Sequence, residues 1–341
     1  MRVVYNPPCM RKIIVLVVLF LAAGFVYLSL GEIEHIVATL NQGNFWLILL
    51  AGLVQVIWFV VTGFTYLTLY RLLGMDATIF KMTLISAAAN FVNVIAPSGG
   101  MGGMAVFISN ANRNGQSPGK ATVISMLFVF LDYIAFLCIL TLGLVVLVRR
   151  NDLDASEITA SIIMFAIALG LGFLLYLGSQ SAEALGNLLA AFARLGNRIA
   201  RPFIHRDYLS EKRAHEFAHE MAEDLKALPQ HGRSLITPLA YALLGKTLMM
   251  SILAISFLSF GVPFTAGVII GGFSIAYLFL IVSPTPSGIG IVEGIMPLAL
   301  TSLNVPWSQA VIITLAYRGI TFWLPLGVGA VAFRTLDRIS S

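Results

Sequence analysis

Long apolar stretches run through most of this chain, and they constrain its fold more than any other feature. Six of them are long enough to cross a hydrocarbon core about 30 Å thick as helices. Of the 341 residues, 58% are hydrophobic and only 11% are charged, which excludes soluble globular and disordered proteins. We therefore predict an all-α polytopic membrane protein with spans at 13–30, 45–70, 121–148, 160–178, 235–260 and 308–333.

The first apolar stretch also has the charged start of a signal peptide, since Arg2, Arg11 and Lys12 precede it. A secretory signal has a shorter apolar core that ends in a small-x-small cleavage site. The stretch at 13–30 is long, and no clear site of that kind precedes Gly31. We expect an uncleaved first span, with a removed signal peptide as the alternative.

Two further apolar regions, 82–110 and 264–304, are broken in the middle by proline and glycine. The first contains PSGGMGG and the second contains PTPSGIGIVEG. Broken backbone at membrane depth is tolerated only where protein or a water-filled cavity satisfies the exposed N–H and C=O groups. A helical arm of about 15 residues rises roughly 22 Å, which is enough to pass the middle of the hydrocarbon core. We therefore predict two re-entrant hairpins.

Basic residues set the direction of each hairpin, because Lys and Arg collect on the cytoplasmic side of short loops. If region 82–110 dips in and returns, most of the 21 basic residues lie on one side, including those of the charged, amphipathic segment 179–234. This arrangement predicts an inner membrane protein with both termini in the cytoplasm. The second hairpin then dips from the opposite side, so the membrane halves 1–178 and 235–341 contain an inverted repeat.

Each repeat unit carries a charge at a similar depth in its third element. Asp132 lies twelve residues into that element of the first unit, and Arg318 lies eleven residues into that of the second. Hairpin tips that enter from opposite sides can meet near the midplane. Helix N-termini at such tips present unpaired N–H groups and a partial positive charge, which suits an anion and is typical of transporter sites.

The second broken region carries a recognisable pattern. PTPSGIGIVEG, followed by YRGITFWLP at 317–325, resembles the signature of flippase-like membrane proteins related to the transmembrane region of bacterial lysylphosphatidylglycerol synthetases. The resemblance covers nearly the whole chain and implies a membrane domain that binds or translocates lipid. The positions that fit the family pattern are Pro286, Gly288, Gly290, Glu293, Tyr317 and Arg318.

The chain departs from this family pattern on one side of the expected site. Many relatives carry an acid and an arginine after the first glycine turn, where this chain has uncharged residues at 104–107. They often carry a Glu-Arg pair where this chain has Phe128 and Val129. The chain also ends at Ser341 without an aminoacyltransferase domain, so we expect no synthetase activity, no other enzyme activity and no cofactor.

The charged residues inside apolar segments are the main candidates for the site. An unpaired charge there costs about 2.5 to 3.5 kcal/mol, so Glu293 and Arg318 are expected to pair or to share a polar ligand. A structural ion pair is one reading, and a phosphate held by the Arg318 guanidinium is the other. Asn90 and Asn93 of the first hairpin are expected to cap or bridge broken backbone. The predicted substrate-binding residues are Arg318, Glu293, Gly288, Gly290, Pro286, Tyr317, Lys246, Asp132, Asn93, Pro97, Gly100 and Gly102.

Two other motif matches point to different chemistry. HEFAH at 215–219 places His215 and His219 on one helix face with a glutamate available, as in zinc metalloproteases, but no third ligand stands at a recognisable spacing. An amphipathic surface helix explains the same residues. AYALLGKT at 240–247 loosely fits a P-loop, but it runs inside an apolar span rather than after a strand.

The function that these features predict is transport of an anionic or polyprenyl-type lipid head group across the inner membrane. Without a nucleotide site, transport is expected to be passive or ion-coupled, with Asp132 and Glu293 as candidate proton carriers. Expected partners are membrane lipids and enzymes of lipid synthesis or glycosyl transfer, but not nucleic acid. The alternatives are a membrane zinc metalloprotease that uses HEFAH and a membrane scaffold that transports nothing.

Overall fold

The computed structural model describes residues 36–95, 101–150, 155–204, 211–226, 232–283 and 285–339. Every regular element within these ranges is helical, so the prediction of an all-α polytopic protein is confirmed. The first predicted span at 13–30 lies outside the described residues. The elements are α2 (Phe45–Leu72), α3 (Ile79–Ile95), α4 (Met101–Arg113), α5 (Pro118–Arg150), α6 (Ala155–Gln180), α7 (Ala182–Ile204), α8 (Glu211–Lys226), η1 (Gly232–Leu235), α9 (Ile236–Ser259), α10 (Ala266–Val282), η2 (Pro286–Gly288), α11 (Ile291–Ser302), α12 (Trp307–Arg318), η3 (Gly319–Trp323) and α13 (Leu324–Ile339).

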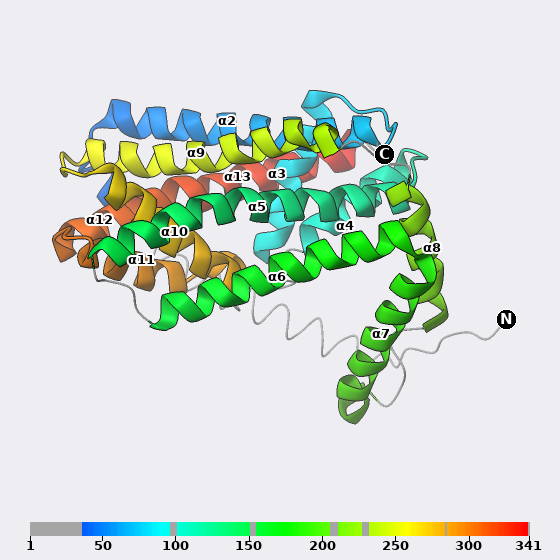
Figure 1. The fold of residues 1–341 in the computed structure, drawn as a ribbon. Coiled ribbons are helices and arrows are strands. Elements are labelled where there is room, and N and C mark those ends of the chain that lie inside the picture. The colour runs from blue at the N-terminus through cyan, green and yellow to red at the C-terminus, as the bar shows by residue number, and fades with distance from the viewer. Residues whose placement is uncertain are drawn as a thin grey trace.

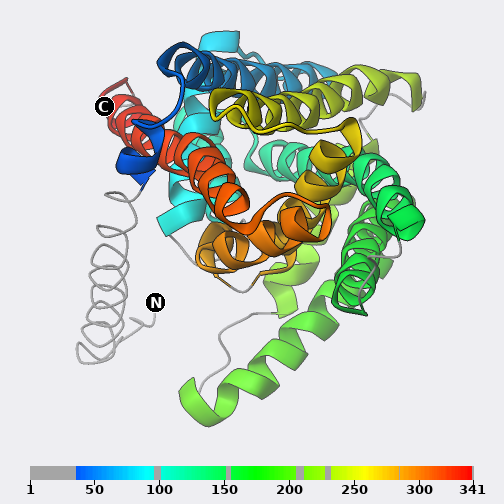
Figure 2. The same ribbon diagram turned by 90° about the vertical axis from the view of Figure 1, so that its left-hand side faces the viewer.

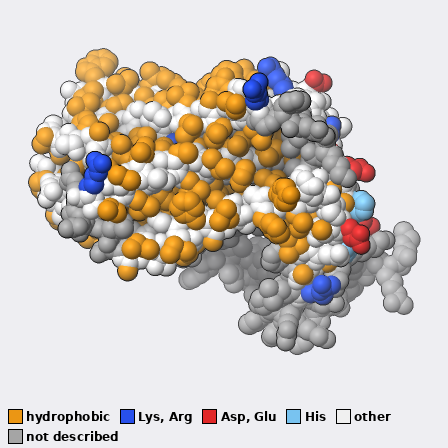
Figure 3. All heavy atoms as spheres, in the orientation of Figure 1, with side chains coloured by type: hydrophobic (Ala, Val, Ile, Leu, Met, Phe, Trp, Pro, Cys, Tyr) orange, Lys and Arg blue, Asp and Glu red, His pale blue; other side chains and the backbone are white. Residues whose placement is uncertain are grey.

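Five helical segments of the described chain are long and apolar enough to cross a membrane, and each overlaps a predicted span. Large apolar side chains on them face outward, as shown by Trp46, which is 73% exposed. Hydrophobic side chains cover the body of the molecule in Figure 3, and charged side chains gather mainly at the end where α8 lies. Such a surface is suited to lipid, as expected for a multi-pass membrane protein. The five segments are Phe45–Leu72, Pro118–Arg149, Ser161–Gln180, Arg233–Ser259 and Trp307–Leu336.

The last of these segments contains one turn of π-helix, which was not predicted from the sequence. This turn, η3, begins directly after Arg318 and separates α12 from α13. Pro325 lies at the start of α13 and has no N–H to donate to the carbonyl of Thr321, four residues earlier. A widened turn accommodates this break, and single turns of π-helix are frequent at functional sites.

Helices α2 and α9 lie side by side and antiparallel along one edge of the bundle (Figure 1). The N–H of Asn44, at the start of α2, donates to the carbonyl of Ser259 at the end of α9, at 2.8 Å. Farther along, the rings of Phe64 and Tyr241 stack with centroids 5.5 Å apart. Figure 2 views the bundle from the end where α11 and α12 lie, with α2 and α9 paired at the top.

Both broken regions fold as two short helices with an interruption between them. In the first region α3 has 17 residues and α4 has 13, and in the second α10 has 17 and α11 has 12. At 1.5 Å per residue, each arm is about 18 to 26 Å long, shorter than a hydrocarbon core of about 30 Å. In Figure 1, α3 and α4 belong to the end that holds α8, and α10 and α11 to the opposite end. Helix α3 contacts η2, so the two interruptions lie near each other.

The turns that lead into the two broken regions are built alike. Gly74 lies two residues after the end of α2 with φ +66°, and Gly261 lies two residues after the end of α9 with φ +65°. In each turn the amide after the glycine donates to a carbonyl near the helix end, at 2.9 Å after α2 and 3.0 Å after α9. Glycine adopts this left-handed conformation without steric cost, so both positions require it for the same reason.

The packing of the two broken regions is also matched. Helix α3 packs against α13, and α10 packs against α5. At the first crossing, a Cβ on Gly329 would lie 2.6 Å from the carbonyl oxygen of Ala87, and at the second, a Cβ on Gly143 would overlap the side chain of Ser274. Ala87 and Ser274 occupy the same position of two 17-residue helices. Each first arm therefore crosses, at a glycine, the span that follows the broken region of the other half, and this glycine permits close helix packing.

Candidate functional site

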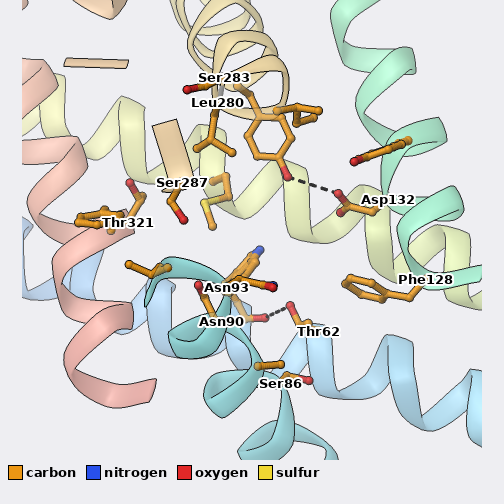
Figure 4. A pocket seen from close by; sticks show the side chains of 18 of the residues that line it. Thr62, Ser86, Asn90, Asn93, Phe128, Asp132, Leu280, Ser283, Ser287 and Thr321 are labelled. Atoms are coloured by element: carbon orange, nitrogen blue, oxygen red, sulfur yellow. Dashed lines mark hydrogen bonds between the residues drawn. The ribbon is translucent and has the colours of Figure 1, made fainter. Parts of the chain in front are cut away.

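A central cavity of about 450 Å³ lies where the two broken regions approach each other (Figure 4). Its walls come from both halves of the chain and from seven helices together with η2 and η3. This volume is within the range of small-molecule sites. The described residues that line it are Trp58, Thr62, Tyr66, Ser86, Ala89, Asn90, Asn93, Val94, Phe107, Phe128, Asp132, Tyr133, Met249, Tyr277, Leu280, Ile281, Ser283, Thr285, Ser287, Arg318, Thr321 and Phe322.

Arg318 and Glu293 form an ion pair beside this cavity. Arg318 Nε donates to Glu293 Oε1, and a terminal guanidinium nitrogen donates to the carbonyl of Ser287 at 3.3 Å. The guanidinium also lies over the ring of Phe322, 4.5 Å from its centroid. The Arg318 side chain is only 2% exposed, and that of Glu293 is 15% exposed. The pairing expected from the sequence is therefore present, and it joins α12 to the start of α11.

The position of Glu293 follows from the turn before it. Gly290 precedes the first residue of α11 with φ +77°, and its N–H donates to Glu293 Oε2 at 2.8 Å. A carboxylate in the first helical turn is stabilised by the helix dipole and by free N–H groups. Glu293 thus uses one oxygen to cap α11 and the other to hold Arg318.

Lys246 and Asp132 form a second ion pair, which the sequence analysis places in the site without pairing the two residues. Lys246 Nζ lies 2.6 Å from Asp132 Oδ1, and it also donates to the Tyr277 hydroxyl, which in turn donates to Asp132 Oδ2 at 3.3 Å. The ammonium lies 4.0 Å from the centroid of the Tyr277 ring. Side-chain exposure is 5% for Lys246 and 24% for Asp132. This pair connects α9 to α5, one helix from each half.

Asn93 bridges the interruption of the first broken region, as expected for an asparagine at broken backbone. Its Oδ1 accepts from the N–H of Gly103, at the start of α4. A Cβ on Gly103 would overlap the Asn93 amide, so glycine is needed for this approach. Asn90 lies one turn earlier on α3, and Figure 4 shows it in the cavity wall near Thr62.

The two predicted glycines of the second turn, Gly288 and Gly290, both have a positive φ but differ in their surroundings. Gly288 has φ +70°, and a Cβ there would lie 2.6 Å from Val292 Cγ2 and 3.2 Å from Leu280 Cα. The backbone of Gly288 therefore lies close to Val292 and Leu280 of the protein. Gly290 also has a positive φ, but a Cβ there would meet open space. Neither glycine lines the central cavity in the described chain.

The remaining predicted residues separate into three groups. Tyr317 is buried in the apolar core next to Arg318 rather than in the cavity wall. Gly102 is the second residue of α4, and Pro286 is the first residue of η2. Pro97 and Gly100 lie outside the described residues. The described cavity wall contains three of the twelve predicted site residues: Asp132, Asn93 and Arg318. Glu293 and Lys246 lie outside this wall, where Glu293 pairs with Arg318 and Lys246 pairs with Asp132.

The HEFAH histidines lie on α8, away from the cavity. His215 is half-buried and packs so closely on Gly186 of α7 that a Cβ there would overlap the imidazole, and His219 is exposed. Among the described residues, no three His, Cys, Asp or Glu side chains gather in a group that could hold a metal ion. His215 therefore takes part in the packing between α7 and α8.

Several wall residues were not predicted from the sequence. Tyr277 connects the Lys246–Asp132 pair to α10, and the sequence signal for it is a tyrosine among large side chains that are otherwise apolar. Ser283, Thr285 and Ser287 flank the second interruption, and Ser287 has a positive φ of 49°. Polar residues next to Pro284 and Pro286 mark such a site, because they satisfy broken backbone.

Comparison with known proteins agrees with this architecture. Residues 12–329 match the family described as the lysylphosphatidylglycerol synthase TM region. The chain belongs to this family. The resemblance inferred from the motifs is therefore confirmed over nearly the whole chain, and it places both ion pairs and the cavity within the shared region.

Two archaeal relatives in this comparison match the chain at low identity. A UPF0104 membrane protein of Methanothermobacter thermautotrophicus is 23% identical over 328 residues, which are 94% of each chain. A UPF0104 membrane protein of Methanocaldococcus jannaschii is 21% identical over 324 residues, 94% of this chain and 93% of the relative. The alignments span nearly the full length of all three proteins, so the similarity extends to the whole membrane region.

Proposed function

We propose that this protein is a lipid transporter that moves a polar head group through the central cavity while the lipid chains stay in the bilayer. The observation that carries the proposal is a cavity with both polar and apolar lining and two ion pairs at its wall, set among helices whose outer faces are apolar. Ionisable residues within membrane segments commonly mark a substrate or ion pathway. Membership of a family named for a lipid synthase supports a lipid as the substrate.

Two re-entrant hairpins would give this cavity access to both sides. The α3–α4 region would dip from the side of α8, the α10–α11 region from the other side, and the two halves would form an inverted repeat. Matched glycine turns after α2 and α9 and matched glycine crossings of α3 and α10 support this symmetry. Rocking of one half against the other would then expose the cavity alternately, as in transporters with such repeats.

The proposed orientation puts α7, α8 and the C-terminus in the cytoplasm and the chain in the inner membrane. Figure 1 has these elements at the same end of the bundle, which fits the distribution of basic residues in the sequence. Asp132 is the proposed proton carrier, because it is the most exposed of the four paired charges and contacts the cavity.

Native mass spectrometry of the purified protein tests whether the cavity holds lipid. Asn90→Trp fills the cavity from α3, and Asn112→Trp is its control, because Asn112 is exposed on α4 outside the cavity wall. We expect bound lipid on the wild-type protein and on Asn112→Trp, and its loss from Asn90→Trp. Equal lipid retention by all three proteins, or no lipid on any of them, would contradict the proposal.

A further inference from the structure

Five of the six serine and threonine hydroxyl groups in the described cavity wall donate their protons within the protein. Thr62, Ser86 and Thr321 each donate to the carbonyl four residues earlier in their helix, at 2.8 to 2.9 Å. Thr285 donates to the carbonyl of Ile289 at 3.0 Å, which leaves Ser283 to donate to Thr285. A hydroxyl oxygen that has donated still has lone pairs and can accept. These groups therefore offer acceptors to a ligand, not donors.

The charged groups add to this excess of acceptors. Asp132 is a carboxylate that lines the cavity and is 24% exposed. Arg318 and Lys246 are only 2% and 5% exposed, and each is already held by a carboxylate, a second oxygen and an aromatic ring. A phosphate group has only acceptor oxygens and needs donors or cations. Arg318 lines the cavity and Lys246 lies outside its wall, and each cation is already paired with a carboxylate before a ligand enters.

The net charge of the four groups is zero, since two cations are paired with two carboxylates. A ligand with a net charge would bring an uncompensated charge into this cavity, at a cost in desolvation. An uncharged ligand rich in O–H groups meets the acceptors without that cost. The amides of Asn90 and Asn93 add donors for the oxygen atoms of such a ligand.

The apolar part of the wall consists largely of aromatic rings. Trp58, Phe128 and Tyr133 line the cavity. Tyr66 lines it too, but its ring stacks against both Phe107 and Phe128, with centroids 3.9 and 4.2 Å away, so its faces are covered. The face of an aromatic ring is partly negative and attracts the partly positive C–H groups of a saturated ring. A sugar ring combines such C–H faces with hydroxyl groups at its edge.

We infer that the head group taken by this cavity is an uncharged, polyhydroxylated group of the glycosyl type. The inference rests on the proposed lipid transport and names its substrate class: a glycolipid whose sugar lies between Asp132, Asn90 and the aromatic wall. Of the two head groups that the sequence predicts, anionic or polyprenyl-type, it differs from the anionic one, because each cation is already paired with a carboxylate. Any phosphate in such a lipid would lie outside the cavity.

A head-group panel in proteoliposomes tests this inference. The probes are fluorescent diacyl lipids with identical chains that carry a glucosyl, a bare phosphate or a primary-amine head group, and their transbilayer movement is measured by dithionite quenching. A second arm measures efflux of soluble methyl glucoside from the same vesicles. We expect the glucosyl lipid to move faster than both charged lipids. Asn90→Leu should slow the movement of the glucosyl lipid about tenfold, because it removes one neutral hydrogen bond to the sugar. The control variant, Asn112→Leu, should move the glucosyl lipid at the wild-type rate.

The outcomes separate the inference from the function on which it rests. Movement of the phosphate or amine lipid at or above the glucosyl rate would overturn the glycosyl assignment and still support lipid transport. No movement of any lipid above empty vesicles would overturn both. Efflux of methyl glucoside without lipid movement would show a sugar site that serves a soluble substrate, and would overturn the lipid assignment. An unchanged glucosyl rate in correctly folded Asn90→Leu would overturn the proposed recognition by Asn90.

Discussion

Removing either partner of the Lys246–Asp132 pair should destabilise the protein unequally. Asp132→Asn leaves an ammonium that is 5% exposed with no anionic partner, and breaking a buried pair in this way costs about 3 to 5 kcal/mol. Lys246→Met leaves a carboxylate that is 24% exposed and still accepts from the Tyr277 hydroxyl. The free energy of unfolding should therefore fall by about the value of one charged hydrogen bond, about 1.5 to 3 kcal/mol. The double variant has no unpaired charge, so the two effects should fall short of additivity by about 2 to 3 kcal/mol.

The wild-type protein, the two single variants and the double variant form a double-mutant cycle. Their unfolding can be compared by SDS titration in mixed micelles, with the fluorescence of the four tryptophans as the signal. Arg334→Met is a control for loss of a charge, because Arg334 is exposed on α13 and its removal should change the unfolding free energy by less than about 0.5 kcal/mol. Additive single effects within about 0.5 kcal/mol, or a larger loss for Lys246→Met than for Asp132→Asn, would refute the reasoning.

Three further predictions concern the turn, the histidines and the orientation. Gly288→Ala should destabilise the protein by at least about 1 kcal/mol more than Gly290→Ala in the same titration, because both strain a positive φ but only the Cβ at Gly288 meets neighbouring atoms; equal losses would contradict this. His215→Ala with His219→Ala should leave zinc content by elemental analysis and lipid movement unchanged, and one zinc per chain that the double variant loses would favour the protease alternative. A single cysteine at Arg206, in a chain without Cys9 and Cys138, should be labelled only from the cytoplasmic side, and labelling from outside sealed cells would invalidate the proposed orientation.

Local patterns in the sequence were sufficient for much of the fold. Apolar length locates the spans, and the proline and glycine clusters locate both interruptions, because these signals depend only on neighbouring residues. The pairing of Glu293 with Arg318 could also be expected, since each is an isolated charge in an apolar segment and their segments are adjacent. The π-helix after Arg318 could not be predicted, because Pro325 by itself is equally compatible with an ordinary helix kink.

The site could be predicted only in part, because its wall joins segments that are distant in the chain. Lys246 and Asp132 are both visible as intramembrane charges, but their pairing depends on how α9 crosses α5. The cavity acceptors are ordinary serines and threonines, and only the structure shows that their protons are used within the protein. The sequence therefore predicts charged residues at the site, whereas the structure shows that both cations are buried and paired with carboxylates.

The proposed repeat illustrates the same limit. Ala87 and Ser274 share no side-chain chemistry, and the two interruptions have different sequences. What matches is the position of glycine after α2 and α9 and at the crossings with α13 and α5. Close helix approach requires a small residue at one point and leaves the rest of the helix free to vary.

The most direct test of the central claim is transbilayer movement of lipid by the purified protein with the cavity open and filled. Wild-type protein and Asn112→Trp in proteoliposomes should move a fluorescent lipid faster than empty vesicles do, and Asn90→Trp at equal incorporation should fall to the rate of empty vesicles. A wild-type rate in Asn90→Trp would show that the head group does not pass through the central cavity.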